Sequence, residues 1–422
     1  MVFFAAIFWI FRFAHRYGST SLPGEGVEFR TDPETSLETQ NLVNITNYCK
    51  FRKGISYKGQ YIGEPGPGLL GIGTIREGGG FRSDKVRTYG GPYKGVHEVR
   101  SGDVYVALTS QDGLLIGSTA KIPDSFEGNG IVTHHTAKVE WTTDDKEIQD
   151  FIYWKMNSLD FINHCQYLSY GTTVYAVSPR DVERYLVPNN LTPEQKKKIS
   201  LLNNLNKLRI NTQSSVELNT STINEVFIEF YLKSNGNSGE LTPLKNLAKI
   251  KTDSINPLDF PDEKYTYYSI PSFDLNQEPV VTRGSEIKSN KYLIPDDSIL
   301  ISKLNPRFKR IWNPSSNSLH PSICSTEFLP LLPNDVSWKY FFFCLLNSHD
   351  FYWELRNLVT GTTGSHQRVR KQDIEKILIR PPSDKCIKQL NNLITPLFEK
   401  LKEDKEKISR IQIMMHEIIN KL

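Results

Sequence analysis

The sequence predicts an α+β protein in which two β-rich bodies are each followed by a long α-helix, and the two helices pair as an antiparallel coiled coil. Three observations support this fold class: the chain repeats itself over most of its length, each repeat holds short alternating strands, and each repeat ends in a proline that precedes a helical pattern. The chain has 422 residues, of which 38% are hydrophobic and 23% charged. This composition is typical of a globular protein with two or three domains.

The repeat is clearest where positions 151–173 are placed over 341–363, because they align without a gap and share the pattern Asn-Ser-x-Asp-Phe and the triplet Gly-Thr-Thr. The second copy then has two extra residues, after which Asp181-Val-Glu aligns with Asp373-Ile-Glu and both copies lead into proline. Further upstream, "RSGDVYVALTSQDG" from Arg100 aligns with "PDDSILISKLNPRF" from Pro295. We therefore expect each copy to hold a β-rich body, a short helical segment, a tight Gly-Thr-Thr turn and a proline before the long helix.

The segments after the two prolines are predicted to be helices. In the first, Thr192 is suited to cap the helix and Pro193 to occupy its first position. In the second, residues 383–422 place apolar side chains at alternating three- and four-residue steps, broken only by Asp404, and Pro396 should kink the helix near its first turns. A helix of ~35–40 residues is ~50–60 Å long and is expected to act as a spacer.

The helix-pairing surface is predicted from these steps, although the first helix also places Arg209, Thr212 and Asn219 in line with it. The alternative is ordinary core packing of each helix within its own body. The residues expected to pair the helices or bind a partner are Leu202, Leu205, Val216, Ile223, Leu390, Leu397, Leu401, Ile408, Ile411 and Met415.

The five cysteines are widely spaced and include no CxxC pair, which favours reduced thiols and a cytoplasmic protein over a disulfide framework or a structural zinc. The apolar run from Met1 to Phe11 is shorter than the about 20 residues that span a bilayer. Its basic residues follow the run instead of preceding it, unlike those of a signal peptide. We expect residues 1–40 to be an irregular extension, with membrane attachment as the alternative.

The sequence contains only imperfect matches to catalytic motifs, and we expect no enzyme activity, no cofactor and no metal. "NPRF" from Asn305 differs from the [ND]PP[YF] loop of amino-methyltransferases, and "GIGTIR" from Gly71 fails the GxGxxG pattern. Adjacent His134 and His135 lack a spaced partner for zinc and, on a strand, would point to opposite faces. A nuclease that uses Asp124, Asp144 and Lys146 remains a weak alternative.

Basic and polar side chains gather in loops of both bodies. Arg contacts guanine, Asn or Gln contacts adenine, and Lys contacts phosphate in DNA complexes. The net charge of +4 and the pI near 8.5 permit such a partner without requiring it. The predicted DNA-binding residues are Arg76, Arg82, Lys85, Arg87 and Lys94 in the first body, and Lys303, Asn305, Arg307, Lys309, Arg310, His366, Gln367 and Arg368 in the second.

Three segments are similar to the specificity subunit of type I restriction–modification systems: residues 267–312, residues 347–382, and the helix opening "LTPEQKKKISLLNNLNKL" from Leu191. The resemblance covers roughly residues 42–422, and the first body departs more from the family than the second. It implies target-recognition domains at 41–188 and 236–382, a central spacer helix at 189–235 and a C-terminal spacer helix at 383–422.

The resemblance also implies a function without catalysis. A protein of this kind recognises a bipartite site in double-stranded DNA, with half-sites ~34–36 Å apart. It holds two modification (methyltransferase) subunits, which flip out and methylate adenine, and restriction/motor subunits join for cleavage. No membrane contact is expected. Two alternatives stay open: the specificity chain of a related system with a fused methyltransferase-nuclease partner, and a scaffold that binds proteins and not DNA.

Overall fold

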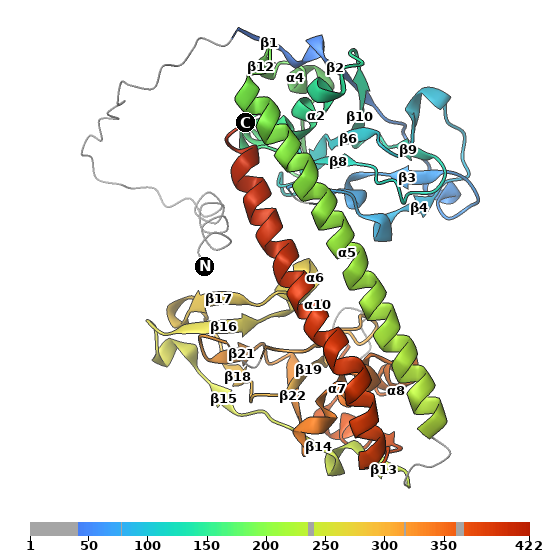
Figure 1. Cartoon of the computed structure of the whole chain (residues 1–422), viewed down its shortest axis with the longest axis vertical. Helices are drawn as coiled ribbons and strands as arrows, with labels where there is room; N and C mark the ends of the chain where they lie inside the picture. The colour runs from blue at the N-terminus through green and yellow to red at the C-terminus, as the bar shows by residue number, and fades with distance from the viewer. Residues whose placement is uncertain (1–40, 77, 235–239, 316–317, 360–366) are drawn as a thin grey trace. The chain divides into compact units, whose positions relative to one another are not determined.

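The computed structural model describes residues 41–76, 78–234, 240–315, 318–359 and 367–422 (Figure 1). The chain divides into two compact units. Within the described ranges, the first unit comprises residues 41–213 and 405–422, and the second comprises residues 214–404. Each unit therefore contains one β-rich body together with part of both long helices.

The first unit is built on two four-stranded sheets. One is antiparallel, in the order β2-β10-β6-β8: Cys49–Lys53, Thr136–Trp141, Val104–Ala107 and Thr119–Lys121. The other has the order β4-β3-β9-β5: Arg87–Thr88, Gly68–Leu70, Gly130–Val132 and Glu98–Val99. Its central pair, β3 and β9, is parallel, while both edge strands are antiparallel to their neighbours.

The second unit repeats this arrangement. Its antiparallel sheet has the order β14-β22-β19-β20: Ala248–Ile250, Phe328–Pro333, Ile299–Ser302 and Ile311–Trp312. Its other sheet has the order β15-β18-β21-β16-β17: Ser254–Ile255, Lys291–Leu293, Ser322–Cys324, Lys264–Tyr268 and Val280–Arg283. The pair β16 and β21 is parallel, as β3 and β9 are in the first unit.

The strand orders match element by element, since β17-β16-β21-β18 corresponds to β4-β3-β9-β5 with one extra edge strand. A two-stranded ladder also recurs in both units: β1 (Leu42–Asn44) with β12 (Leu186–Pro188), and β13 (Thr242–Pro243) with β23 (Leu378–Ile379). The repeat seen in the sequence is thus a repeat of the whole β-rich fold.

The shared pattern Asn-Ser-x-Asp-Phe forms a junction between two helices in each unit. The Asn157 amide donates to the carbonyl of Tyr153 at 2.7 Å, which satisfies the end of one helix. The Ser158 hydroxyl accepts from the backbone N–H of Phe161 at 3.3 Å, which caps the start of the next helix. Asn347 and Ser348 make the same two hydrogen bonds in the second unit. The helices joined in this way are α2 (Lys146–Lys155) and α3 (Leu159–Tyr167), and α7 (Lys339–Asn347) and α8 (His349–Asn357).

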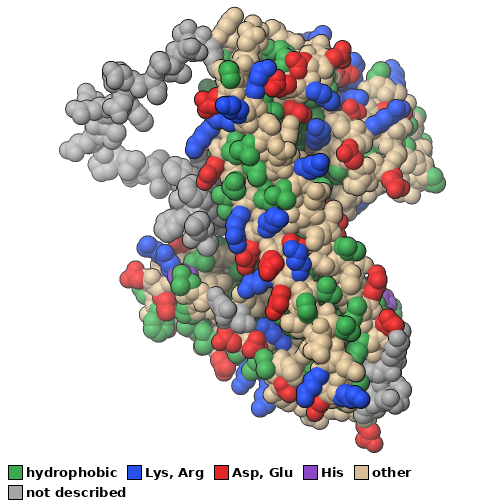
Figure 2. Space-filling view, viewed as in Figure 1, with side chains coloured by type: hydrophobic (Ala, Val, Ile, Leu, Met, Phe, Trp, Pro, Cys, Tyr) green, Lys and Arg blue, Asp and Glu red, His purple; other side chains and the backbone are tan. Residues whose placement is uncertain are grey.

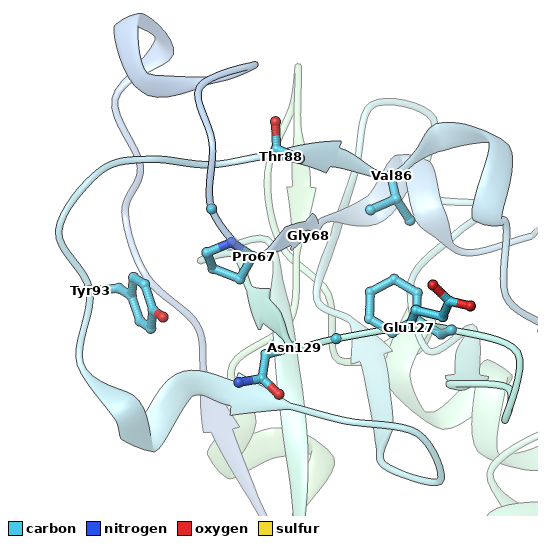
Figure 3. Close-up of a pocket in the computed structure, with 10 residues that line it drawn as sticks. Pro67, Gly68, Val86, Thr88, Tyr93, Glu127 and Asn129 are labelled. Carbon is cyan, nitrogen blue, oxygen red and sulfur yellow. The ribbon is translucent and has the colours of Figure 1, made fainter.

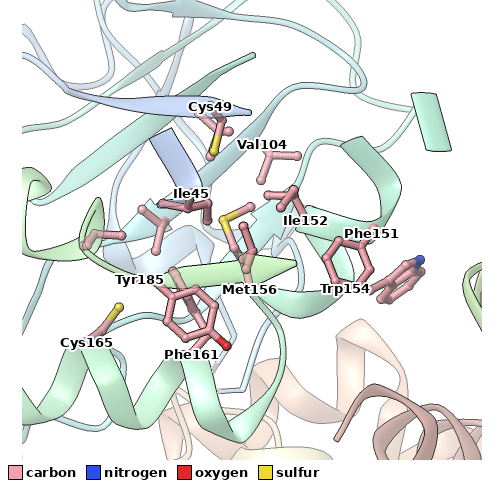
Figure 4. Close-up of a cluster of buried hydrophobic side chains, with 14 of the residues drawn as sticks. Ile45, Cys49, Val104, Phe151, Ile152, Trp154, Met156, Phe161, Cys165 and Tyr185 are labelled. Atoms are coloured by element: carbon pink, nitrogen blue, oxygen red, sulfur yellow. The ribbon is translucent and has the colours of Figure 1, made fainter. Parts of the chain in front are cut away.

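The junction anchors the main core of the first unit, which Figure 4 shows. Phe161 is fully buried, and its ring meets that of Tyr185 edge-on with centroids 5.0 Å apart. The Tyr185 hydroxyl donates to Asp160 at 2.6 Å, so the acidic residue of the pattern is also used within the fold. Cys49 and Cys165 lie in this core as free thiols, and the remaining three cysteines are free as well. Burial raises the pKa of the Cys49 thiol to about 12, so it stays protonated and unreactive.

The two long helices are α5 (Pro193–Ser234) and α10 (Asp384–Ile419). Thr192 and Gln195 form a reciprocal cap at the start of α5, because the backbone N–H of each donates to the side chain of the other at 3.0 and 3.2 Å. The start predicted from the sequence is therefore confirmed. Helix α10 continues through Pro396 as one helical segment.

Contacts between α5 and α10 run antiparallel within each unit. In the first unit the Gln195 amide and the Lys198 ammonium donate to the carbonyls of Leu422 and Lys421, at 3.2 and 2.8 Å. In the second unit the Ser215 hydroxyl donates to Asp404 at 2.7 Å. The only polar residue in the predicted α10 surface is thus a buried partner of the other helix. The regular supercoil of a coiled coil stays a prediction.

The predicted helix-pairing residues are all buried or half-buried. Each helix also packs on the β-rich bodies, for example through the Trp154 indole, which donates to Asn203 at 2.9 Å. Both alternatives weighed from the sequence therefore apply together. Leu202, Leu205, Ile411 and Met415 belong to the core of the first unit, Ile223 and Leu390 belong to that of the second with Leu397 and Leu401 packed against it, Val216 is buried, and Ile408 is half-buried.

The predicted N-terminal extension, residues 1–40, lies outside the described residues. Among the helices that the structure describes, none combines the length and the apolar character needed to cross a membrane.

Candidate nucleic-acid interface

The second unit presents a compact loop directly after strand β19. The chain leaves the strand at Ser302 and turns through Asn305–Phe308, closed by a hydrogen bond from the N–H of Phe308 to the carbonyl of Asn305 at 2.9 Å. Asn305 has a φ of 46°, in the left-handed region that Asn tolerates better than most residues. The backbone shape of the loop is therefore specified by its own residues.

The same loop is joined to a segment more than 60 positions later in the chain. The N–H of Asn305 donates to the carbonyl of Gln367 at 2.8 Å, and the N–H of Val369 donates to that of Lys303 at 3.0 Å. An antiparallel bridge pairs Leu304 with Arg368 between these two bonds. Two clusters that the sequence predicted separately thus lie together, while His366 falls outside the described residues.

An aromatic ring at the exposed tip of the loop lies close to one exposed and one buried guanidinium group. Phe308 is 49% exposed, and the guanidinium carbons of Arg307 and Arg310 lie 4.8 and 5.2 Å from its ring centroid. Such contacts hold guanidinium groups in place through the charge distribution of the ring. Exposed aromatic and guanidinium planes together are typical of surfaces that contact nucleobases.

Arg310 and Lys309 have partners inside the unit. Arg310 is only 9% exposed and forms a two-pronged ion pair with Asp274 on helix α6 (Ile270–Asn276), at 2.7 and 2.8 Å. Lys309 donates to the carbonyl of Asn347 at 2.8 Å, and burial lowers the pKa of its ammonium group. These two residues, predicted to bind DNA, fix the loop on the body, so we leave them out of the interface proposed below.

Arg368 is paired with Glu327, whose carboxylate accepts at 2.9 Å from one guanidinium nitrogen and at 3.2 Å from another. This hydrogen bonding raises the pKa of Arg368, which stays charged. The ion pair is partly exposed, with 44% of the Arg368 side chain accessible. The contact with Glu327 orients the guanidinium group of Arg368, which follows Gln367 in the chain.

In the first unit the predicted cations spread over several elements. Arg76 begins a turn closed by hydrogen bonds between Arg76 and Gly80 at 2.9 Å and between Gly79 and Arg76 at 3.0 Å. Gly78, Gly79 and Gly80 all have positive φ, which explains the run of glycines.

Arg82 and Lys85 flank Asp84 at 3.3 and 3.6 Å. Partial burial acts to raise the pKa of Asp84, but the charges and hydrogen bonds of these two cations lower it below its ordinary value. Both cations are therefore partly neutralised by a neighbour in their own loop.

Arg87 and Lys94 are sequence neighbours of residues that line a pocket of about 430 Å³, shown in Figure 3. Val86 and Thr88 line the pocket, so Arg87 between them on strand β4 points to the other face. Its lining includes Glu127 and no Lys or Arg, which makes it a poor phosphate site. The residues that line this pocket are Gly66, Pro67, Gly68, Val86, Thr88, Tyr93, Phe126, Glu127, Gly128 and Asn129.

In the first unit, the structural counterpart of the Asn305–Phe308 loop is not the segment that contains the predicted cations. The N–H of Val177 donates to the carbonyl of Leu108 at 2.9 Å, which matches the bond from Val369 to Lys303. Strand β7 (Thr109–Ser110) pairs with β11 (Tyr175–Ala176), which matches the bridge between Leu304 and Arg368. Residues 110–113 therefore occupy the position of residues 305–308.

Sequence reasoning missed this counterpart because the loop contains no Lys or Arg. The pairing of Arg100 with Pro295 in the repeat already placed Gln111 and Asp112 opposite Pro306 and Arg307. The alignment was thus a better guide to position than the density of basic residues.

One expectation about the histidine pair was wrong. His134 and His135 lie in a turn between β9 and β10, and their ring centroids are 3.8 Å apart, so they do not point to opposite faces of a strand. His135 instead shares a hydrogen bond with the Thr109 hydroxyl at 2.9 Å. Burial is the main cause of the lowered pKa of His135. Across the described residues, no group of three or more His, Cys, Asp or Glu side chains is arranged to hold a metal ion.

Acidic and basic side chains are interspersed over the face of the described residues seen in Figure 2. On this face neither sign of charge dominates.

Comparison with known proteins found no matching family model and no matching curated protein. Three solved structures each match over 92% of this chain. The HsdS subunit from Thermoanaerobacter tengcongensis is 15% identical over 97% of its own length, with a TM-score of 0.30. A structure titled for the complex assembly and conformational transition of the type I R-M system is 13% identical over 98%, with a TM-score of 0.36.

The type I restriction–modification S subunit from M. genitalium is 14% identical over 97% of its own length, with a TM-score of 0.53. This chain has the fold of a type I specificity subunit. The fold class predicted from the sequence and the resemblance noted there are both confirmed at this level: two β-rich units with long helices. At 14% identity the likeness extends to the fold, and function is inferred from the loops described above.

Proposed function

We propose that this chain is a non-catalytic subunit that recognises a bipartite site in double-stranded DNA, one half-site for each unit. The observation that carries the proposal is the duplicated fold with unlike loops at one equivalent position. Residues 305–308 are basic and aromatic, whereas residues 110–113 are polar and acidic. Two equal scaffolds that present different side chains suit the recognition of two different short sequences.

In the second unit the proposed base contacts come from residues on the joined loops. Gln367 carries an amide that pairs with adenine, while Arg307 and Arg368 carry the guanidinium group that pairs with guanine. Asn305, also predicted to bind DNA, has a buried side-chain oxygen and is assigned to shaping the loop. Lys303 is assigned to a phosphate contact.

In the first unit the predicted cations are assigned to phosphates. Arg76, Arg87 and Lys94 are exposed, and Arg82 and Lys85 pair only with a surface carboxylate, which is a weak competitor in water. Contacts of this kind position a protein on DNA without selecting a sequence.

We further propose that the long helices hold the protein partners. Large apolar side chains are exposed on both helices: Leu201, Leu208, Leu218 and Ile228 on α5, and Leu393, Ile413 and Met414 on α10. Apolar side chains that face solvent along a helix mark docking surfaces when they occur in groups. Two modification subunits would dock there and methylate adenine after flipping it out of the duplex, with restriction/motor subunits added for cleavage and the complex located in the cytoplasm.

The decisive experiment selects duplexes from a random-sequence pool with the purified full chain and sequences the bound fraction. Two short enriched motifs at a fixed separation are expected. A protein-binding scaffold would enrich no motif, and a chain with nuclease activity through Asp124 and Asp144 would cut the pool when a divalent metal is added.

Mapping methylated adenine in the source genome tests the partner assignment, because the same two motifs should flank or contain the modified bases. A related system with a fused methyltransferase-nuclease partner would give the same DNA motif and is separated by the size of the co-purified partner.

A further inference from the structure

Residues 110–113 of the first unit occupy the place that the Asn305–Phe308 loop occupies in the second unit. Equivalent backbone hydrogen bonds hold both loops to equivalent segments of their units. A second correspondence confirms the match: the N–H of Leu108 donates to the carbonyl of His135 at 2.9 Å, as the N–H of Lys303 donates to that of Glu327 at 2.9 Å.

The loop has a fixed shape and an exposed amide at its tip. The Asp112 carboxylate accepts from the Ser110 hydroxyl at 2.6 Å and from the N–H of Leu114 at 3.0 Å, which closes a local turn. The Gln166 amide also stabilises the turn, because it donates a hydrogen bond to the carbonyl of Leu114 at 3.4 Å. Gln111 lies between these anchors and is exposed.

A hairpin rich in exposed tyrosine lies beside this loop. Tyr170 and Ala176 exchange backbone hydrogen bonds at 2.9 and 2.8 Å, and the Gly-Thr-Thr triplet forms the tip. Gly171 has a φ of 126°, and a Cβ there would collide with the carbonyl oxygen of Val174, so the turn requires glycine. Tyr167 is 88% exposed, Tyr170 is 63% exposed and Tyr175 is 37% exposed.

The basic turn that begins at Arg76 borders the same segment. The N–H of Gly78 donates to the Ser118 hydroxyl at 3.2 Å, and the N–H of Gly80 donates to the carbonyl of Thr119 at 2.9 Å. Ser118 and Thr119 come seven and eight positions after Gln111. The turn that carries the exposed Arg76 is therefore joined to the same chain segment as the loop with the exposed glutamine.

From this arrangement we infer that Gln111, Tyr167 at the end of helix α3, and the tyrosine hairpin, residues 170–176, form the base-recognition surface of the first unit. The inference rests on the proposed function, and it names the residues that contact bases in the first unit, for which only phosphate contacts were proposed above. The Gln111 amide is suited to the N6 and N7 edge of adenine in the major groove. The tyrosines supply flat apolar contacts and hydroxyl donors to bases or sugars, and Arg76 contacts a flanking phosphate. Duplex DNA is the proposed occupant, because the loop of residues 110–113 is the counterpart of a loop with an exposed arginine at its tip and is joined to a turn that carries the exposed Arg76.

The test uses the full chain and selection from a pool of random-sequence duplexes, with the second unit as an internal reference. Gln111→Ala and Tyr170→Ala are expected to relax one half of the enriched motif and leave the other half unchanged. Loss of one amide-to-base contact should reduce the preference at that base pair roughly 5- to 150-fold. Gln60→Ala removes an exposed glutamine on another element of the same unit and serves as the matched control.

The outcomes separate this inference from the function on which it rests. If the unaltered chain enriches no motif, the proposed function fails and the inference fails with it. If the chain enriches a bipartite motif that Gln111→Ala and Tyr170→Ala leave intact, only the inference is overturned. Loss of a protein partner by these variants with an unchanged motif would likewise overturn it and assign the hairpin to protein docking. Circular dichroism spectra and unfolding curves of each variant show whether it is folded like the unaltered chain, so that a change of motif can be assigned to the lost side chain.

Discussion

Removal of the serine cap at the helix junction should destabilise the two units unequally. Ser158 is 1% exposed, and its hydroxyl both donates to the carbonyl of Lys155 at 2.7 Å and accepts from the N–H of Phe161 at 3.3 Å. Ser158→Ala removes the cap and leaves a buried N–H without a partner, and we expect a loss of about 2 kcal/mol. Ser348 caps Phe351 at the same distance but is only half-buried, so water replaces part of the lost bond and Ser348→Ala should cost about 1 kcal/mol.

Hydrogen exchange read by mass spectrometry measures each unit separately, which thermal unfolding of a chain with two units does not. If these helices open locally, exchange should rise roughly 30-fold in peptides covering residues 158–168 of Ser158→Ala, and about fivefold in residues 348–358 of Ser348→Ala. Ser200→Ala changes an exposed serine within helix α5 and should leave both peptides unaltered. Equal losses in the two units would refute the argument that burial sets the cost of losing the cap. A change of DNA motif without a change of exchange would refute a purely structural role for the shared pattern.

Three further outcomes are expected. Arg307→Ala should relax one base pair of the half-site bound by the second unit by roughly 1–3 kcal/mol in a selection experiment; weakening of all sequences alike would show a phosphate contact. Arg76→Ala should lower the slope of log affinity against log salt by about 1 and leave the motif unchanged, whereas an altered motif would assign Arg76 to a base. Met414→Asp should weaken co-purification of a modification subunit while DNA selection persists, since Met414 is 48% exposed on α10, and an intact complex would exclude this face as the docking surface.

Features that depend on neighbours in the sequence were predicted well. The start of α5 follows from Thr192, Pro193 and Gln195, three residues within one turn, and the repeat follows from identity at matched positions. The spacing of apolar residues predicts which faces of α5 and α10 are buried, and the structure adds that both helices also pack on the β-rich bodies.

Features that depend on tertiary neighbours were not predicted. The role of Arg310 is set by Asp274, which lies 36 positions away and meets it only after the sheets form. His134 and His135 were placed on a strand, but the structure has a turn there that brings their rings together. The loop of residues 110–113, the counterpart of residues 305–308, was not predicted, because it carries no basic residue and its position is set by the bond from Val177 to Leu108.

The arrangement of backbone bonds explains how two units with one fold present such different loops. Leu108 and Val177 in the first unit, and Lys303 and Val369 in the second, fix the ends of their loops through main-chain atoms alone. Lys309, Arg310 and Asp112 hold their loops through the hydrogen bonds described above, whereas the exposed side chains between these anchors contribute little to the fold. Exposed positions such as Gln111 and Arg307 are therefore expected to change the recognised sequence at small cost to stability. The costly positions are the buried caps and phenylalanines of the shared pattern, which is why the pattern is the same in both copies while the loops differ.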